Sequence, residues 1–541
     1  MTGPELLPTR ARYAADEPIV LEVRGTDRPG TVIVRHLGDE VLRARHGGGD
    51  TIVLGWLPIG GYGVDFVADD GTALRTAVDV AGYAGARLRY GFVVDYSPGR
   101  DLAGVADTVR RLHLDGVQFY DWAYRHADLM GGGAEYRDAL DQPISLATVR
   151  ALVQTVQNAG SRALGYAAVY AVGPAEWGDW SHRALLTASG APYGLGDFLF
   201  LVDPAAPDWR ESFTGQLARA TAELGFDGFH LDQYGYPKRA VRPDGEVVDV
   251  AESFGAVIRS VRDRLPESTL VFNNVNDFPT WLTATAPQDA VYIEVWDPQL
   301  TLGSLARVVS RARDLAGDTP VAIAAYQHVY DSAPAEAADR ATALTMATLY
   351  SHGATQLLAG EADRILVDPY YVRNHVVEAS TAALLKRWYD FLVEHDEVLL
   401  DPAIVDVTGS YAGAYNDDCD VSFRGVAVTE EARAGSVWRR ITAAGDRLVV
   451  HLINLRGQDD ELWDAPRRDP VPPGPGTLRF RRVGVGVPRV RAADPDAAGR
   501  LIELPVELDG DWATATLPDF TLWLMVVIDP VPEPTEMREL P

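Results

Sequence analysis

The chain has 541 residues, 47% of them hydrophobic, and its 49 basic and 77 acidic side chains give a formal net charge of −28. This length exceeds what one hydrophobic core serves, so we expect about two to four domains in an ordinary globular protein. An acidic surface repels nucleic acid and anionic membranes, whereas a neutral partner such as a carbohydrate is compatible with it.

Redox and targeting signals are sparse. Cys419 is the single cysteine, so no intrachain disulfide can form, and its acidic neighbours argue against a reactive thiolate. No window approaches the ~18 continuous apolar residues of a membrane span. The N-terminus lacks a basic segment followed by an apolar run, so we expect a cytoplasmic protein, or a secreted one if a leader precedes the numbered chain.

Residues 1–86 are predicted to form an immunoglobulin-like β-sandwich. Short apolar runs separated by turn residues recur at the spacing of such a domain. The segment from Pro58 to Tyr62 resembles the corner found in immunoglobulin-like domains. The runs are 18–23, 30–35, 51–54 and 61–67.

From Arg87 the pattern changes to an apolar strand, a loop and an amphipathic helix, repeated eight times. The predicted strands are 90–95, 116–122, 163–170, 228–232, 270–274, 290–296, 321–327 and 354–360. Predicted helices between them include 102–112, 145–158, 209–224, 250–264, 302–315 and 337–350. Eight such repeats predict a (β/α)8 TIM barrel over residues 87–399, with its active site at the carboxyl ends of the strands.

Polar and aromatic residues gather at those predicted strand ends, where a barrel places its active site. Any one of them can simply end a strand, but a whole ring of them favours a functional face. The ring comprises Asp95, Tyr96, Asp121, Trp122, Tyr170, Asp232, Tyr234, Asn273, Asn274, Glu294, Trp296, Gln327 and Glu361.

Two insertions follow the second and third predicted strands, at 123–133 and 173–198. The longer one contains Trp177, Trp180 and Tyr193. Such rings can stack on sugar faces or simply anchor a loop, and we favour sugar stacking.

After a helix at 382–395, the sequence is strand-rich from about residue 400, most clearly at 448–455 and 521–528. The proline-rich segment 470–476 is predicted to be a loop. We expect a C-terminal β-sandwich over residues 400–541.

Asp232 and Glu294 are the candidate catalytic residues. Each is a carboxylate near the end of an apolar strand, which is costly unless the charge has a use. Two acids facing one cleft are what hydrolysis of a glycosidic bond requires. A short aspartate suits a nucleophile, and a longer glutamate suits an acid/base whose pKa is raised by burial. Trp296 lies on the same side of the strand as Glu294 and can supply an apolar wall.

Three segments resemble glycoside hydrolase family 66, the family of dextranases and cycloisomaltooligosaccharide glucanotransferases. They are 118–126 (QFYDWAYRH), 226–235 (FDGFHLDQYG) and 292–296 (YIEVW). The resemblance implies retaining enzymes acting on α-1,6-glucan, with Asp232 as nucleophile and Glu294 as acid/base. It also implies the same order of three modules. No sugar-binding module, wall anchor or long insertion after the last barrel strands is visible, which favours a short oligosaccharide substrate.

The remaining strand-end residues are candidates for binding sugar hydroxyls, since charge-assisted hydrogen bonds to hydroxyls are strong and directional. Asp95, Asp121 and His126 are the strongest of them. The full predicted substrate-binding set is Asp95, Asp121, Trp122, Tyr124, His126, Tyr170, Tyr234, Asn273, Asn274, Trp296, Gln327 and Glu361.

Several alternatives stay open at this point. A transglycosylase uses the same covalent intermediate, and a non-hydrolytic glycan-binding barrel would need one acid misplaced. We expect no metal and no cofactor, because the 11 histidines form no His-x-His pair and Gly131 to Gly133 lacks dinucleotide-binding spacing. Carboxyl groups about 5–5.5 Å apart would indicate retention, and about 6.5–9.5 Å inversion. The sequence leaves the oligomeric state, the sugar and the linkage undetermined.

Overall fold

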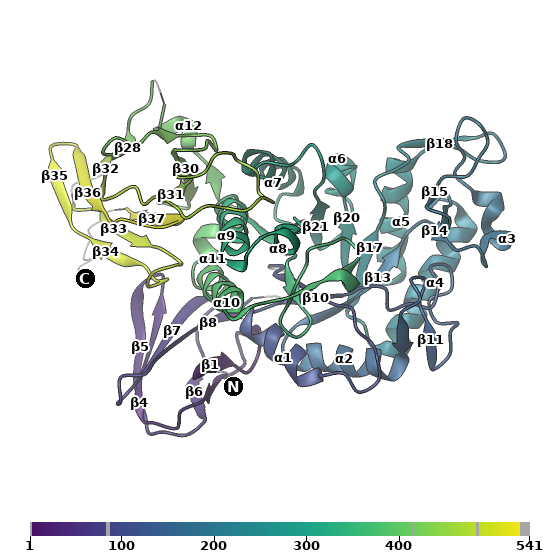
Figure 1. Cartoon of the computed structure of the whole chain (residues 1–541), viewed down its shortest axis with the longest axis horizontal. Helices are drawn as coiled ribbons and strands as arrows, with labels where there is room; N and C mark the ends of the chain where they lie inside the picture. Colours follow the sequence, from purple (N-terminus) through teal and green to yellow (C-terminus); the bar gives the residue numbers. More distant parts are fainter. Residues whose placement is uncertain (1–2, 83–86, 414, 483–485, 531–541) are drawn as a thin grey trace, which may run out of the picture.

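The computed structural model describes residues 3–82, 87–413, 415–482 and 486–530. Figure 1 shows a central α/β unit, with an N-terminal and a C-terminal β-rich unit side by side at one end of it. Long insertions on the central unit extend at the opposite end. Within the described ranges, no helix has the length and apolar character needed to cross a membrane.

The N-terminal unit is a β-sandwich whose two sheets have the orders β1-β3-β6 and β2-β8-β7-β4-β5. One apolar cluster, which includes Leu21 and Phe66, fills the space between the sheets. The Tyr62 hydroxyl donates to the Pro58 carbonyl over 2.8 Å, at the corner noted in the sequence. The strands are β1 Glu5–Pro8, β2 Tyr13–Ala14, β3 Ile19–Arg24, β4 Gly30–His36, β5 Asp39–His46, β6 Thr51–Gly55, β7 Gly60–Ala68 and β8 Ala73–Ala81.

The central unit is built on parallel strands in the order β23-β22-β21-β20-β17-β13-β10-β9-β24. Because both faces of such a sheet are covered, its strands are almost wholly buried. The strands are β9 Tyr90–Val93, β10 Gly116–Phe119, β13 Arg162–Ala168, β17 Gly228–Asp232, β20 Thr269–Asn273, β21 Ala290–Glu294, β22 Val321–Ala324, β23 Ala354–Gln356 and β24 Ala359–Gly360.

The predicted eighth strand, 354–360, is divided in the structure. Ala354 to Gln356 pair with β22, whereas Gly360 pairs with Phe92 of β9. Because of this division, the first part of the segment pairs with β22 and its last residue pairs with β9, the first strand of the barrel. The two ends of the sheet are thereby joined. The strand order is therefore the one expected of a (β/α)8 barrel, and we call this unit the barrel.

Within the described residues, eight helices follow the barrel strands, and β23 and β24 share the last of them. Seven of these helices match the predicted ranges within a few residues. The fifth, which the sequence analysis did not predict, is a single turn. Side-chain caps fix the starts of two of them: Asp101 accepts from the Gly104 amide in α1, and Thr301 and Ser304 form a capping box in α7. They are α1 Leu102–Arg111, α2 Leu146–Asn158, α4 Pro207–Leu224, α5 Val250–Arg264, α6 Thr280–Thr283, α7 Leu302–Ala316, α9 Ala335–Ser351 and α10 Ala379–Glu394.

Short elements occupy the loops on the carboxyl side of the strands. After β10 lie β11 Glu135–Arg137 and β12 Pro143–Ser145, and after β13 lie β14 Ala171–Val172, α3 Trp177–Trp180, η1 Ser181–Arg183, β15 Gly194–Leu195 and β16 Leu199–Leu201. Further along the chain are β18 Arg239–Val241, β19 Val247–Asp249, η2 Val275–Asp277, α8 Val329–Ser332, β25 Arg364–Ile365, η3 Tyr371–Arg373 and β26 His375–Val376.

The C-terminal unit is a second β-sandwich. Its sheets have the orders β27-β30-β31-β37-β33-β34 and β28-β32-β36-β35, and one apolar cluster fills the space between them. Cys419 is buried there, and burial raises the pKa of its thiol to about 12. The elements are α11 Asp396–Leu399, β27 Val405–Asp406, α12 Thr408–Tyr411, β28 Cys419–Phe423, β29 Val428–Thr429, β30 Val437–Ala444, β31 Arg447–Asn454, β32 Gly476–Arg481, β33 Arg489–Ala493, β34 Ile502–Leu504, β35 Val506–Asp509, β36 Trp512–Leu517 and β37 Trp523–Asp529.

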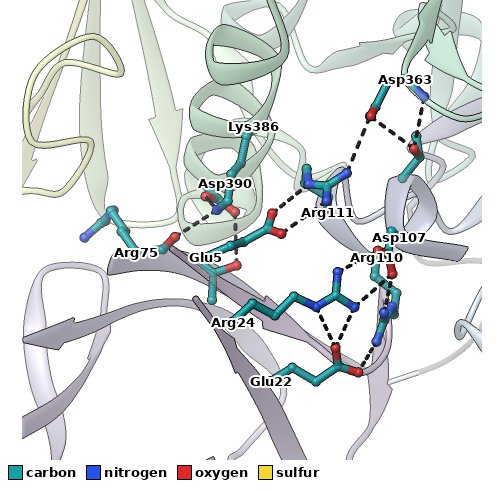
Figure 2. Close-up of polar contacts among 12 residues, drawn as sticks. Glu5, Glu22, Arg24, Arg75, Asp107, Arg110, Arg111, Asp363, Lys386 and Asp390 are labelled. Carbon is teal, nitrogen blue, oxygen red and sulfur yellow. Dashed lines mark hydrogen bonds and ion pairs between the residues drawn. The ribbon is translucent and has the colours of Figure 1, made fainter. Parts of the chain in front are cut away.

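Ion pairs join the N-terminal sandwich to the barrel (Figure 2). Arg24 of β3 lies 2.5 Å from Asp107 of α1, and Arg110 of α1 lies 2.6 Å from Glu22. Arg111 pairs with Glu5 of β1 over 2.6 Å. The first helix of the barrel is therefore held against two strands of the sandwich by charge pairs on both.

Candidate active site

Three neighbouring barrel strands each end in a polar residue. Strands β17, β20 and β21 pair in parallel, in that order, and their last residues are Asp232, Asn273 and Glu294. Since the carboxyl ends of parallel strands meet at one face of a barrel, the three side chains converge. Both carboxyl groups are half-buried, and Asn273 is buried between them.

Asn273 links the two acids directly. Its Nδ2 donates to Asp232 Oδ1 over 2.7 Å and to Glu294 Oε2 over 2.9 Å. The two acceptor oxygens therefore lie no farther apart than these bond lengths added together, about 5.6 Å. The two predicted catalytic acids face one space.

Asp232 has a second donor, the hydroxyl of Tyr166 on β13, which lies 2.7 Å from Oδ2. Each of its oxygens thus accepts a hydrogen bond, from opposite sides. Donors of this kind stabilise the ionised carboxylate and fix its orientation.

The pKa values of the two acids are raised by burial and shifted further by different neighbours. Burial raises the pKa of Glu294 to about 7, and the nearby charge of Asp232 adds to the rise. Burial also raises the pKa of Asp232, but hydrogen bonds from Tyr166, Asn273 and the Gln233 backbone oppose it. The arrangement therefore favours a proton on Glu294 and a charge on Asp232.

The two acids line a cavity of about 240 Å³ at the carboxyl end of the barrel. Its wall is rich in tyrosine and includes residues from nine separate segments of the chain. The lining residues are Gln118, Tyr120, Asp121, His126, Leu140, Tyr166, Leu195, Phe198, Leu199, His230, Asp232, Gln233, Tyr234, Tyr236, Asn273, Val275, Tyr292, Glu294, Trp296, Tyr326, Pro369, Tyr370 and Tyr371.

Tyr371 closes one side of this cavity from the loop between β25 and β26. Its ring stacks on Tyr120 with centroids 4.2 Å apart, and its hydroxyl donates to Gln118 Oε1 over 3.2 Å. A half-apolar, half-polar wall of this kind is typical of small-molecule sites.

Within the described part of the chain, no group of three or more His, Cys, Asp or Glu side chains is arranged to hold a metal ion.

Comparison with known proteins shows the family of the chain. The family model described as glycosyl hydrolase family 66 matches residues 10–527. The chain belongs to glycosyl hydrolase family 66.

Two relatives have established names. A cycloisomaltooligosaccharide glucanotransferase from Niallia circulans is 24% identical over 370 residues, which are 60% of this chain and 38% of the relative. A dextranase from Streptococcus salivarius is 31% identical over 113 residues, 19% of this chain and 14% of that enzyme. The chain thus spans well under half the length of these relatives.

Solved structures share the fold. A cycloisomaltooligosaccharide glucanotransferase from Paenibacillus sp., crystallised with cycloisomaltoheptaose, superposes with a TM-score of 0.86 at 18% identity, covering 97% of this chain and all of that one. An α-amylase from Geobacillus thermoleovorans, complexed with acarbose, gives 0.53 at 12% identity, covering 82% of this chain and 98% of that one. Identities this low show the fold alone.

The structure brings part of the predicted family 66 site together. The predicted residues that line the cavity are Asp121, His126, Asp232, Tyr234, Asn273, Glu294 and Trp296. Those that do not line it are Asp95, Trp122, Tyr124, Tyr170, Asn274, Gln327 and Glu361.

Glu361 and Asp95 hold the loop after β9. Glu361 is buried, accepts from the Val94 and Asp95 amides and pairs with Arg100. The Asp95 side chain is exposed and accepts from the Ser97 amide. Both carboxylates are thus used by the protein backbone rather than directed at the cavity.

Asn274 and Gln327 are buried behind the strand ends. Asn274 donates to the carbonyls of Phe272 and Tyr292, and Gln327 is fully buried beside the Thr345 hydroxyl. Each follows a cavity-lining neighbour, Asn273 or Tyr326, and adjacent side chains of an extended segment point to opposite faces.

The three aromatic candidates outside the cavity support it from behind. The Trp122 indole donates to the Tyr166 carbonyl over 3.1 Å. The Tyr170 hydroxyl donates to the Tyr236 carbonyl over 2.7 Å and accepts from the Tyr234 amide. Tyr124 packs edge-on against Tyr136.

Sugar stacking by the insertion after β13 is not supported at the residues that we favoured. Trp177 packs on Phe200 with centroids 4.4 Å apart, and Trp180 packs edge-on against Trp209. Trp177, Trp180 and Tyr193 do not line the cavity, and other residues of the same insertion do, namely Leu195, Phe198 and Leu199.

Several residues that line the cavity were not predicted from the sequence. His230 and Tyr292 precede the two acids by two positions, so strand alternation was a signal for both. Tyr166 lies two positions before Ala168, the last residue of β13, and pairs in register with His230, so the same alternation was a usable signal for it. Tyr371 comes from a loop far along the chain and left no such trace.

Proposed function

We propose that this family 66 protein is a retaining glycoside hydrolase acting on α-linked glucan, with α-1,6-linked isomaltooligosaccharide or dextran as substrate. Asp232 is the nucleophile and Glu294 the acid/base. The proposed mechanism is a double displacement that uses these two carboxyl groups.

One observation carries the retaining mechanism: a single amide nitrogen of Asn273 bonds both acids, which limits their nearest oxygens to about 5.6 Å. Retaining enzymes separate their carboxyl groups by about 5–5.5 Å, and inverting enzymes need about 6.5–9.5 Å to admit a water. A nearest-oxygen distance of at most about 5.6 Å lies closer to the retaining than to the inverting spacing, and this supports the retaining mechanism.

The protonation states support the same roles. Glu294, with its pKa raised to about 7 by burial and by Asp232, holds the proton that the leaving oxygen takes. Asp232 attacks the anomeric carbon, the glycosidic C–O bond breaks, and that proton moves to the leaving oxygen. Esterification then removes the charge of Asp232, so the pKa of Glu294 falls and the residue can accept a proton from water.

The choice of linkage rests on the named relatives, a dextranase and glucanotransferases of cyclic isomaltooligosaccharides. A neutral sugar also suits a cavity lined by tyrosines, an asparagine and a neutral histidine, since burial lowers the pKa of His126 to about 4.

Transglycosylation is the second candidate, because two relatives are named glucanotransferases. It differs only in the acceptor, a sugar hydroxyl instead of water, that intercepts the intermediate. Products should be analysed at rising isomaltooligosaccharide concentration: products longer than the substrate indicate transfer, and shorter ones alone indicate hydrolysis. A glycan-binding protein without catalysis is disfavoured because both acids are in place.

The assigned acids can be tested by Asp232→Ala and Glu294→Gln. Each should lower kcat about a thousandfold or more while substrate binding persists. Sodium azide should rescue the Asp232 variant to a β-glycosyl azide. A Glu294→Ala variant should instead give an α-glycosyl azide, because azide then attacks the covalent intermediate.

The matched control is Asp314→Ala, an exposed acid on the outer helix α7, which should keep wild-type turnover. Wild-type turnover in the Asp232 or Glu294 variant would refute the assignment. An inverted product from the wild-type enzyme, followed by NMR, would refute the retaining mechanism.

The finer description of the fold belongs to the same proposal. We take residues 1–86, 87–399 and 400–541 as three domains, the first immunoglobulin-like. The Tyr62–Pro58 hydrogen bond supports that identity, because a tyrosine corner bonds back to an upstream carbonyl. The boundary at residue 86 lies outside the described residues.

A further inference from the structure

A long segment of the C-terminal sandwich reaches the catalytic face of the barrel. Residues 456–475 connect β31 to β32 without a helix or strand of their own, and we call them the C-terminal arm. Loops of this length in compact proteins usually have a function. The arm contacts the two barrel loops that follow β21 and β22.

The first contact is with the loop after β21. The Trp463 indole donates to the Gln299 carbonyl over 2.6 Å, and the Trp463 amide donates to the Leu300 carbonyl over 3.2 Å. Leu302, the first residue of α7, donates its amide to the Glu461 carbonyl over 2.8 Å. Trp463 is buried, so the arm is packed as well as hydrogen-bonded there.

The second contact is made by Asp464. Its Oδ2 lies 2.9 Å from His328 Nδ1, and its Oδ1 accepts from the Val329 amide over 2.9 Å. One carboxylate thus fixes both the side chain and the backbone of the loop after β22. The bond to Asp464 raises the pKa of His328, which strengthens the pair near neutral pH.

The arm is rigid enough to hold these loops. Buried Arg467 donates to the Asp460 carbonyl over 3.0 Å and to Asp460 Oδ1 over 2.7 Å, and it also bonds the Leu462 carbonyl. Its own carbonyl accepts from Arg340 of α9 over 3.0 Å. The turn that presents Trp463 and Asp464 is therefore closed by one guanidinium and anchored to the barrel.

The two held loops carry cavity residues. Trp296 follows β21 and Tyr326 follows β22, and their rings lie 5.8 Å apart in the cavity wall. Both line the cavity with Glu294, and together with Asn273 they oppose the rise in its pKa that burial and Asp232 cause. Their placement therefore governs how Glu294 holds and releases its proton.

We infer that the C-terminal arm positions Trp296 and Tyr326 against the acid/base Glu294, and that Asp464 is the positioning residue that makes this link. The inference rests on the proposed role of Glu294. It assigns the C-terminal sandwich a part in catalysis although none of its residues lines the cavity among those described.

The surroundings of Glu294 give the sign of the expected change. The titratable groups that face it are Asp232, Tyr292, Tyr326 and Tyr371, and His328 itself is faced by Asp464 and Asp368. A loosened Tyr326 and Trp296 stabilise ionised Glu294 less, so its pKa rises. Since the first step needs protonated Glu294, the alkaline limb of kcat/KM should move to higher pH.

The test compares Asp464→Ala with Asp469→Asn. Asp469 lies on the same arm and pairs with Arg340 over 2.9 Å, away from the catalytic loops. On isomaltooligosaccharide, Asp464→Ala should lower kcat about tenfold with little change in KM, because general acid catalysis is only partly lost. On an aryl α-glycoside with a 4-nitrophenolate leaving group, which needs little protonation, the loss in kcat/KM should nearly vanish, because kcat/KM reports only the formation of the covalent intermediate.

Asp469→Asn should keep the wild-type kcat and pH profile, and Asp464→Asn, which retains an acceptor for Val329, should lie between the two. Equal losses on both substrates, or an alkaline limb unmoved in Asp464→Ala, would overturn the inference and leave the arm a structural strap. Equal behaviour of Asp464→Ala and Asp469→Asn would do the same. Failure of the proposed function shows separately, as wild-type turnover in Asp232→Ala.

Discussion

Asp232 and Glu294 differ in protonation because the charge of Asp232 raises the pKa of Glu294, whereas no neighbouring charge is among the causes that raise the pKa of Asp232. Asp232 accepts from Tyr166 and Asn273 over 2.7 Å each, and Glu294 accepts from Asn273 over 2.9 Å. A donor to an ionised acceptor is worth about 1.5–3 kcal/mol. The two donors at 2.7 Å offset part of the cost of burying the charge of Asp232, and so the proton of the pair resides on Glu294.

Replacing Tyr166 with Phe should raise the pKa of Asp232, because the hydroxyl stabilises only the ionised form. The acidic limb of kcat/KM should therefore move to higher pH, and kcat at the optimum should fall about tenfold to a hundredfold, the equivalent of one charged hydrogen bond. A pH–rate profile of the purified variant measures both.

Tyr124→Phe serves as the matched control, since that ring packs on Tyr136 outside the cavity. Its profile should overlay the wild-type curve. If Tyr166→Phe also overlays that curve, Tyr166 does not set the charge on Asp232.

At the scale of single elements, the end of β20 places two adjacent asparagines in different roles. Asn273 and Asn274 are adjacent, yet Asn273 bridges the acids while Asn274 bonds the Phe272 and Tyr292 carbonyls. Alternation along extended backbone sends one side chain into the cavity and the next into the packing behind it.

Alanine at these two positions should therefore separate activity from stability. Asn273→Ala should lower kcat at least tenfold with a nearly unchanged free energy of unfolding, because it removes the donor shared by both acids. Asn274→Ala should cost about 1–3 kcal/mol of stability, since it leaves the buried Phe272 carbonyl without that donor. Urea unfolding and kcat should be measured on the same preparations of both variants. If the two variants lose the same amount of activity and of stability, the prediction is wrong.

At the scale of the whole molecule, charge pairs dock the N-terminal sandwich on the barrel. Partly exposed pairs surround Arg24, whereas buried Asp390 of α10 pairs with Lys386 (Figure 2). Asp390 also accepts from the Ala77 amide of β8 and bonds His113. Burial alone raises the pKa of Asp390, but Lys386 and His113 outweigh it and hold the pKa below its usual value.

Asp390→Ala should destabilise the protein by about 3–5 kcal/mol, because it removes the carboxylate from half-buried Lys386 and leaves buried His113 and the Ala77 amide without this acceptor. Arg24→Ala, at a partly exposed pair, should cost only about 0–1 kcal/mol. Guanidinium unfolding of both variants measures the difference. Equal losses of unfolding free energy would mean that Asp390 stabilises the contact between sandwich and barrel no more than Arg24 does.

The sign of the pH dependence follows from the lowered pKa. Asp390 contributes its stability above the unfolded pKa of about 3.9, and this contribution is lost as the pH falls through the lower folded value. The difference in unfolding free energy between wild type and Asp390→Ala should therefore shrink below about pH 4.

Local pattern alone predicted most barrel elements to within a few residues. Apolar runs and helical periodicity predicted β17 at residues 228–232 and α5 at 250–264, as the structure has them. The division of the eighth strand into β23 and β24 was not predictable, because it depends on which residues bond β22 and which bond β9. The single-turn α6 carries too few residues for its period to be read.

The sequence by itself determined the repeating strands and helices, the two acids at strand ends and the family, because each depends on residues adjacent along the chain. Only the tertiary structure decided that Asn273 rather than Asn274 joins the acids, that Tyr166 rather than Tyr170 bonds Asp232, and that Asp464 holds a barrel loop. Those contacts join residues 21 to 136 positions apart. Which distant groups meet is set by how strands and domains pack, and packing is a property of the folded chain as a whole.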